Sequence, residues 1–261
     1  MITPPHGVES TGEIVEAAPR AGPLLLLVAV EFEARYLARR LGLPRAPTSP
    51  GRAPAVPPPV VLGRIGLAAA DLPRLGSELA ALRPAGVVVA GLAGGCAPDV
   101  RAGEIVVGGL TASAADGRWL APDAALAERA VAALAAAGVP YRVGRLLTVS
   151  EPMATPAAKA ACWHDHGAVA VDMESAPVLR WAREAGIPAL AVRAVADGPA
   201  DPLPRALVTA VDARGRVRPS VLLGWAARPA LVGSAWRLWR RSRVALDRLA
   251  RFLSAFTAVR P

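Results

Sequence analysis

The sequence is poor in the residues that build metal centres, disulfide frameworks and membrane spans. Its 261 residues include two cysteines and three histidines, too few for a disulfide scaffold or a cysteine-based zinc site. His164 and His166 flank Asp165, but no further ligand lies close in sequence, so we expect no metal. No apolar run approaches the ~20 residues needed to cross a bilayer.

Targeting features are also scarce. Residues 1–22 carry three glutamates, whereas a secretory signal begins with a basic segment. Secretion is therefore not expected. The two cysteines fit a reducing compartment, so the sequence predicts a cytoplasmic protein.

Lysine is nearly absent, because Lys159 is the only lysine among 30 basic residues. Aromatic residues make up 4% of the chain and hydrophobic residues 53%, so aliphatic side chains must fill the core. The net charge of +9 is concentrated in residues 205–261, which hold twelve arginines and two acids. Nucleic-acid enzymes more often spread basic residues around the active cleft, so we expect no nucleic-acid partner.

Apolar strand-like segments alternate with helical ones over most of the chain. This alternation predicts an α/β fold, in which helices cover a sheet. The expected strands are 23–30, 59–63, 86–91, 104–109, 141–149, 168–173 and 188–197. The expected helices are 31–42, 67–82, 121–137, 156–164, 174–185 and 221–256.

Three regions follow from composition. Residues 1–22, rich in Pro, Gly and Glu, form a flexible leader, and residues 23–204 form the catalytic domain. Residues 205–261 form a basic helical extension that contains Trp225, Trp236 and Trp239. Tryptophan and arginine together suit a helix lying on an anionic membrane. The alternative is a C-terminal helix that packs on the core and keeps a solvated basic face.

Three acidic residues follow apolar strands: Glu33, Glu174 and Asp197. A carboxylate at such a place must be paired or hydrogen-bonded. Each one alone is better explained as an N-cap or first-turn acid of a helix, facing the helix dipole. Because all three follow strands of one domain, we expect them to converge on one rim of the sheet.

The segment Gly-Leu-Ala-Gly-Gly, residues 91–95, follows the third expected strand. We interpret it as a turn whose glycines let the backbone approach a sugar or a phosphate. It matches neither the dinucleotide-binding pattern nor a P-loop. A tight turn without a ligand remains the alternative.

Four segments together resemble the purine nucleoside phosphorylase and nucleosidase superfamily, in its methylthioadenosine/S-adenosylhomocysteine nucleosidase-like branch. They are VAVEFEA (28–34), GLAGGCAPDVRAGEIVVG (91–108), AVAVDMES (168–175) and AVRAVAD (191–197), in the order of the family. The resemblance implies a three-layer α/β/α sandwich with a central mixed sheet. It also implies a homodimer and no cofactor, with phosphate as a possible co-substrate.

The resemblance assigns roles to the strand-end acids. Asp197 would donate a proton toward N7 of the purine, and Glu33 would activate water. Glu174 would bind the ribose hydroxyls, with Met173 packed beneath the sugar. The ribose and nucleophile pocket would be lined by the glycine-rich segment, namely Gly91, Ala93 and Gly94. Ser150 and Met153 are the candidates for contact with the purine.

Departures from the family pattern bear on the nucleophile. The positions of two phosphate ligands in bacterial hexameric phosphorylases hold Val89 and Leu92 here. Their loss and the presence of Glu33 favour water over phosphate, although Arg64 remains a possible phosphate ligand. Ala196 replaces a serine that is common before the acid, and TASAADG replaces a Tyr-His-Asp segment.

Residues 197–253, from DGPADPLP to RLARFL, and the segment EPMATPAAKAAC (151–162) resemble the hopanoid-associated phosphorylases. That family is implied to remove adenine from adenosylhopane, a lipid-linked nucleoside. We therefore expect an enzyme that cleaves an adenine nucleoside, with adenosylhopane as the first candidate substrate. We expect this enzyme to lie at the inner face of the cell membrane. One alternative is a nucleosidase for methylthioadenosine or S-adenosylhomocysteine. Another is an inactive nucleoside-binding or membrane-surface scaffold.

Overall fold

The computed structural model describes residues 22–43, 59–203 and 229–258. The first strand, β1 (Leu24–Val28), shows how the core is built, because its side chains alternate between two apolar layers. Leu26 and Val28 enter one cluster and Leu25 and Leu27 the other. Helix α1 (Glu31–Leu41) follows β1 after two residues, so the first turn of α1 lies at the carboxyl end of a central strand.

Eight strands form one mixed sheet among the described residues. The order is β2 (Val60–Arg64), β1, β3 (Gly86–Gly95), β7 (Ala168–Asp172), β6 (Tyr141–Thr148), β4 (Ile105–Ser113) and β5 (Trp119–Leu120). Strand β8 (Ala189–Asp197) pairs with both β3 and β4. The five strands β3, β8, β4, β6 and β7 therefore close into a ring, which leaves β2 and β5 at the two open ends.

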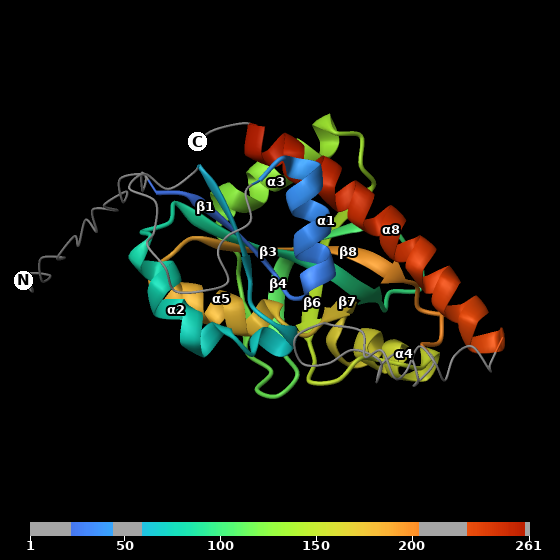
Figure 1. Cartoon of the computed structure of the whole chain (residues 1–261). Coiled ribbons are helices and arrows are strands. Elements are labelled where there is room, and N and C mark those ends of the chain that lie inside the picture. Colours follow the sequence, from blue (N-terminus) through green and yellow to red (C-terminus); the bar gives the residue numbers. More distant parts are fainter. Residues whose placement is uncertain (1–21, 44–58, 204–228, 259–261) are drawn as a thin grey trace, which may run out of the picture.

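Helices cover both faces of the sheet (Figure 1). Helices α1, α3 (Ala124–Ala136) and α8 (Pro229–Ala258) contribute to one apolar cluster. Helices α2 (Leu72–Ala81) and α5 (Ser175–Glu184) contribute to the other. A smaller cluster includes Cys162 of helix α4 (Pro156–His166). The predicted three-layer α/β/α sandwich with a mixed sheet is thereby confirmed.

The two halves of helix α8 differ in burial. Its C-terminal half packs on the sheet and on α1 and α3 through buried side chains that include Leu249, Phe252 and Phe256. Toward its N-terminal end, Trp236 and Trp239 are each 55% exposed. Residues 1–21 and 204–228, with Trp225, lie outside the described residues, so the predicted boundaries at 22 and 204 stay predictions.

Several local predictions were wrong. The segment Gly91–Gly95 is not a turn, because β3 continues through it and pairs with β7 and β8. The expected helix 67–82 divides into the short 3-10 turn η1 (Leu67–Ala69) and α2. Left-handed backbone at Ala68 and Ala69, with φ of 52° and 56°, interrupts it. Strand β5 was missed because two residues carry no periodicity.

The strands that precede the three acids do not all run in the same direction. Strands β1, β3 and β8 are parallel, so Glu33 and Asp197 follow strands that run the same way. Strand β7, which precedes Glu174, runs antiparallel to β3. It reaches the site because its residues Ala170 and Val171 pair with the extended end of β3.

Candidate active site

Two backbone N–H groups, one from the turn before α1 and one from β3, hold the Glu33 carboxylate in place. Glu33 is the third residue of α1 and is only 4% exposed. Its Oε1 accepts a hydrogen bond from the backbone N–H of Leu92 at 2.9 Å, and its Oε2 accepts one from Val30 at 3.3 Å. The second contact is a helix-capping bond, whereas the first ties the carboxylate to the glycine-rich end of β3.

Glu174 caps the entry to α5 and lies equally deep, at 4% exposure. Its Oε1 accepts a hydrogen bond from the N–H of Ala68 at 3.1 Å. Its Oε2 lies 3.5 Å from Nη1 of Arg193. The strained turn η1 therefore lies directly against the carboxylate that was predicted to bind ribose.

Arg193, in the middle of β8, is the charge that organises this site, and it is 1% exposed. Its Nε lies 2.6 Å from Asp172 Oδ2 and donates to Ser175 Oγ at 3.0 Å. Its Nη2 is buried and has no hydrogen-bond partner among the described residues. Buried donors are rarely left unpaired, so this nitrogen is able to donate a hydrogen bond to a ligand at the site.

Burial and one shared cation set the protonation of the two glutamates. Burial raises the pKa of Glu174 to about 7, against the lowering effect of Arg193 and with further raising by Asp172 and Glu33. Burial also raises the pKa of Glu33, opposed by the Leu92 N–H, the charge of Arg193 and the Val30 N–H. Groups poised in this way are typical of catalytic sites.

Asp197 ends β8 and is 5% exposed. Its Oδ2 accepts a hydrogen bond from Lys159 Nζ of α4. Burial raises the pKa of Asp197, and the ammonium of Lys159 lowers it. The predicted acid is thus a buried carboxyl with a cation in contact.

The glycines of β3 lie between these groups. A Cβ on Gly91 would come within 2.8 Å of Arg193 Nη1 and 3.1 Å of Glu33 Oε1. A Cβ on Gly94 would lie 3.5 Å from Asp197 Oδ2. In the β3–β8 register, Gly91 pairs with Arg193 and Gly94 with Asp197. The segment therefore keeps backbone close to both acid clusters, and Ala93 is buried between the two glycines.

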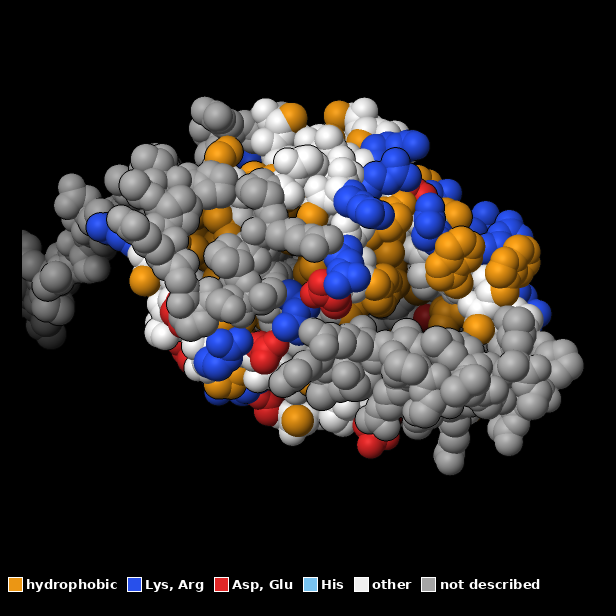
Figure 2. Space-filling view, in the orientation of Figure 1, with side chains coloured by type: hydrophobic (Ala, Val, Ile, Leu, Met, Phe, Trp, Pro, Cys, Tyr) orange, Lys and Arg blue, Asp and Glu red, His pale blue; other side chains and the backbone are white. Residues whose placement is uncertain are grey.

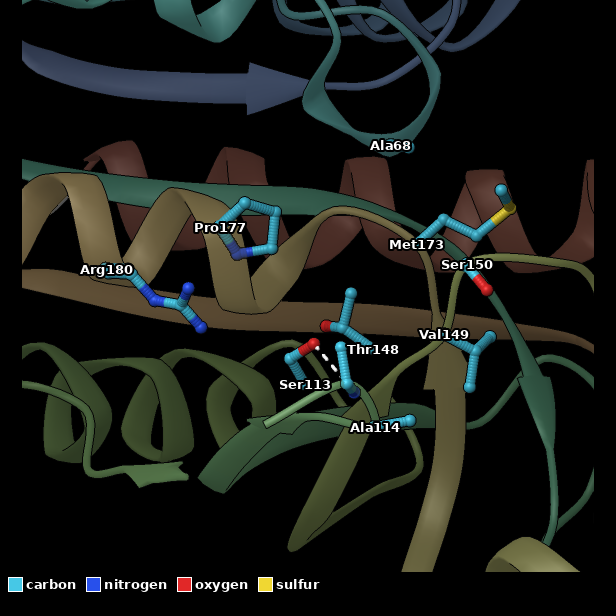
Figure 3. Close-up of a pocket in the computed structure, with 10 residues that line it drawn as sticks. Ala68, Ser113, Ala114, Thr148, Val149, Ser150, Met173, Pro177 and Arg180 are labelled. Carbon is cyan, nitrogen blue, oxygen red and sulfur yellow. Dashed lines mark hydrogen bonds between the residues drawn. The ribbon is translucent and has the colours of Figure 1, made fainter. Parts of the chain in front are cut away.

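A cavity of about 370 Å³ is bordered by Met173, the residue before Glu174 (Figure 3). Met173 and Ser150 border it, together with Thr148 and Val149 at the end of β6. Its size suits a small organic ligand. It is lined by Ala68, Ser113, Ala114, Ala115, Thr148, Val149, Ser150, Met173, Pro177 and Arg180.

Two predicted site residues are placed differently. Met153 is half-buried and packs against the small cluster near α4, not along this cavity. Arg64 forms ion pairs with Glu31 at 3.6 Å and Asp71 at 3.4 Å. Its charge is therefore already matched by two carboxylates.

Sequence reasoning missed Arg193, Lys159 and Asp172. Arg193 could have been noticed in the sequence, because it is the only charged residue inside the apolar run 189–196 and a buried charge needs partners. Lys159 could have been noticed because it is the only lysine of the chain. Asp172 lies inside the resembling segment 168–175, two residues before Glu174. Its Oδ1 accepts a hydrogen bond from Thr148 Oγ1 at 2.7 Å.

The layered mixed sheet and its strand-end carboxylates define a protein of the nucleoside phosphorylase fold. The sequence model of the phosphorylase superfamily matches residues 25–224. The chain belongs to this superfamily, which confirms the resemblance at that level. No curated protein matches the chain in sequence.

Solved structures show the same fold at low sequence identity. Futalosine hydrolase of Helicobacter pylori strain 26695 has a TM-score of 0.66 and 13% identity, over 91% of this chain and 97% of that one. The 5′-methylthioadenosine/S-adenosylhomocysteine nucleosidase of H. pylori with butyl-thio-DADMe-Immucillin-A has a TM-score of 0.67 and 13% identity, over 91% and 98%. The Neisseria meningitidis nucleosidase with methylthio-immucillin-A has a TM-score of 0.63 and 15% identity, over 90% and 99%.

Two further findings concern only the described part of the chain. No helix there is long and apolar enough to cross a membrane. No group of three or more His, Cys, Asp or Glu side chains in it is placed to hold a metal ion.

Proposed function

We propose that the protein hydrolyses the N-glycosidic bond of an adenine nucleoside, with Asp197 as general acid and Glu33 as general base. The observation that carries this proposal is the buried Arg193. It lies 3.5 Å from Glu174, lowers the pKa of Glu33 and keeps one donor unused among the described residues. Asp197 ends the same strand. Membership of the phosphorylase superfamily supports this class of reaction.

Two carboxyl groups with different tasks suit cleavage of this bond. Adenine leaves poorly as an anion, so N7 takes a proton from Asp197 while the C1′–N9 electron pair moves into the purine. Burial that raises the pKa of Asp197 favours this donor role. Water then adds to the oxocarbenium-like C1′ from the opposite face, and Glu33 takes its proton.

Glu174 is the group that recognises the sugar. A carboxylate accepts hydrogen bonds from both ribose hydroxyls, and Arg193 favours its ionised form. Met173, which borders the cavity next to Glu174, supplies an apolar contact beneath the sugar. Ser150 lies on the same cavity wall, where the base would be placed.

Charge favours water over phosphate as the nucleophile. Glu33, Glu174 and Asp172 all raise the pKa of Arg193 by their charge, so one guanidinium faces three carboxyl groups. A phosphate dianion entering this cluster would be repelled by those carboxyl groups that are ionised. Arg64, the possible phosphate ligand, forms ion pairs with Glu31 and Asp71, and its buried Nη1 has no hydrogen-bond partner among the described residues. Phosphorolysis, with phosphate as co-substrate, is the alternative.

We place the substrate in the lipid-linked class, adenosylhopane, because of the exposed part of α8. Trp236 and Trp239 are exposed, and the guanidinium carbons of Arg240 and Arg243 lie 4.9 Å and 5.2 Å from their ring centroids. Figure 2 shows hydrophobic and basic side chains together along this helix. Tryptophan with arginine is the composition of an interfacial helix. Methylthioadenosine or S-adenosylhomocysteine is the second candidate, because similar structures are nucleosidases named for them.

The test is adenine release by the purified protein in phosphate-free buffer. Adenosylhopane in vesicles, methylthioadenosine and a no-substrate control are compared. We expect release from adenosylhopane, with a free C1 hydroxyl on the ribose product. Strict dependence on phosphate, with a 1-phosphate product, would replace hydrolysis by phosphorolysis. No release from any nucleoside would leave the scaffold alternative.

A further inference from the structure

The only lysine of the chain lies in contact with the proposed acid. Lys159 is 0% exposed in the middle of α4, whereas the other 29 basic residues are all arginine. Its Nζ donates to Asp197 Oδ2, to the carbonyl of Gly198 at 2.9 Å and to the carbonyl of Asp201 at 2.8 Å. A chain that uses arginine everywhere else keeps lysine at this one buried position.

The three contacts explain why lysine is needed there. All three partners are acceptors, so the nitrogen must carry three hydrogens and is an ammonium. A compact ammonium can point one N–H at each acceptor, whereas the planar fork of arginine cannot match this arrangement. The ammonium therefore joins α4 to the end of β8 and to the loop that follows it.

We propose that Lys159 is a positioning residue of the reaction: it holds Oδ2 of Asp197 and the loop behind it, so that Oδ1 is presented to the nucleoside base. No described residue donates a hydrogen bond to Oδ1, which fits this role. The inference rests on the proposed function of Asp197 as the acid. It adds a residue that acts through Asp197 and does not touch the substrate.

Besides Lys159, two groups of opposite charge act on Asp197: Asp201 raises its pKa and Arg241 lowers it. Asp201 is paired with Arg241 of α8, with Nη1 and Oδ1 2.6 Å apart, and its Oδ2 accepts from the Gly198 N–H at 2.8 Å. Burial raises the pKa of Cys96 to about 12, so this thiol stays uncharged below that pH. Burial raises the pKa of Asp197 and Lys159 opposes it. Removing the ammonium should therefore raise it further.

The test replaces Lys159 by methionine, which is apolar and of similar length. We expect kcat to fall by about tenfold or more while KM changes by less than about threefold, because the acid is misplaced and not the binding site. The basic limb of the kcat/KM pH profile should move up by about one unit. Lys159→Arg keeps a cation and should return the limb toward its original position. Cys162→Ala, another buried change in α4, should leave the profile unmoved.

A second measurement applies even if the methionine variant does not fold. Protein labelled with ¹⁵N-lysine has a single Nζ signal, since the chain has one lysine. This signal should shift in Asp197→Asn and stay in place in Cys162→Ala. An unmoved signal in Asp197→Asn, or a methionine variant with unchanged kcat and pH profile, would overturn the inference. Retained activity in Asp197→Asn would instead overturn the proposed function.

Discussion

Asp197 is the residue whose loss should affect chemistry most directly. Asp197→Asn keeps the shape of the side chain but removes the proton that it would give to N7. We expect kcat for adenine release to fall by roughly 10²–10⁴-fold. Asp165→Asn, the same change at an exposed position of α4, is the control. If Asp197→Asn stays within about threefold of the parent, Asp197 is not the acid.

Glu174 should discriminate between sugars. In the proposed function its carboxylate accepts hydrogen bonds from both ribose hydroxyls, and a site built for such bonds rejects analogues that lack them. In kcat/KM measurements, Glu174→Ala should weaken cleavage of ribosides much more than that of 2′-deoxyribosides. Glu184→Ala, at the exposed far end of α5, should affect neither. Equal losses on both sugars would show that Glu174 does not read the hydroxyls.

Individual residues differ in how far the sequence revealed them. Glu33, Glu174 and Asp197 were predictable because each acid interrupts the apolar chemistry at a strand end. Their partners were not, because Arg193 meets Glu174 through a long-range pairing between β7 and β3 that local patterns do not encode. Lys159 lies 38 residues before Asp197, and only the folded chain brings α4 to the end of β8.

At the scale of elements, the long apolar strands were predictable, because a strand buried on both faces is an uninterrupted aliphatic run, and the helices were predictable as the segments between them. The pairing of the strands was harder to predict. The glycine-rich segment 91–95 has turn composition, yet it is held extended by β7 and β8 on its two sides. The composition of the tail left two placements open, on a membrane surface or against the core, and Leu249, Phe252 and Phe256 lie in the core.

Helix α8 should bring the protein to anionic membranes through its exposed half. Arg237→Gln with Arg240→Gln should lower sedimentation with anionic liposomes, because each basic residue near such a surface contributes about 1 kcal/mol. Activity on a soluble adenosine derivative should hardly change. Arg241 and Arg243 are left intact, because Arg241 pairs with Asp201 and Arg243 lies over Tyr36.

The matched control for this helix is Arg74→Gln with Arg183→Gln. These two exposed arginines lie on α2 and α5, in the layer on the other side of the sheet. The control removes the same charge, so it should bind liposomes as the parent does, and added salt should weaken the parent's binding. Equal sedimentation of the α8 double variant and the parent would exclude this surface as the membrane contact.

For the whole molecule, the buried site should make stability depend on pH. The pKa of Glu174 is about 7 in the folded protein, against an ordinary value of 4.5 that applies to the unfolded chain. Between these two pH values the folded chain therefore binds more protons than the unfolded chain. Its stabilising contribution is complete below about pH 4.5 and is lost as pH rises to about 7, a change on the order of 3 kcal/mol. The Tm of the parent minus that of Glu174→Gln should therefore fall over this range. A constant difference would contradict the raised pKa.

The strand ring has a consequence for the lifetime of local structure. Strands β3 and β8 have a neighbour on each side within the ring, whereas β2 and β5 pair on one side only among the described strands. Strands at open ends fray by small openings, but a strand inside a closed ring is freed only when the ring breaks. In amide hydrogen exchange, β3 and β8 should therefore exchange last, at rates that report global unfolding. The strand that ends in Asp197 should then be among the last described elements to exchange.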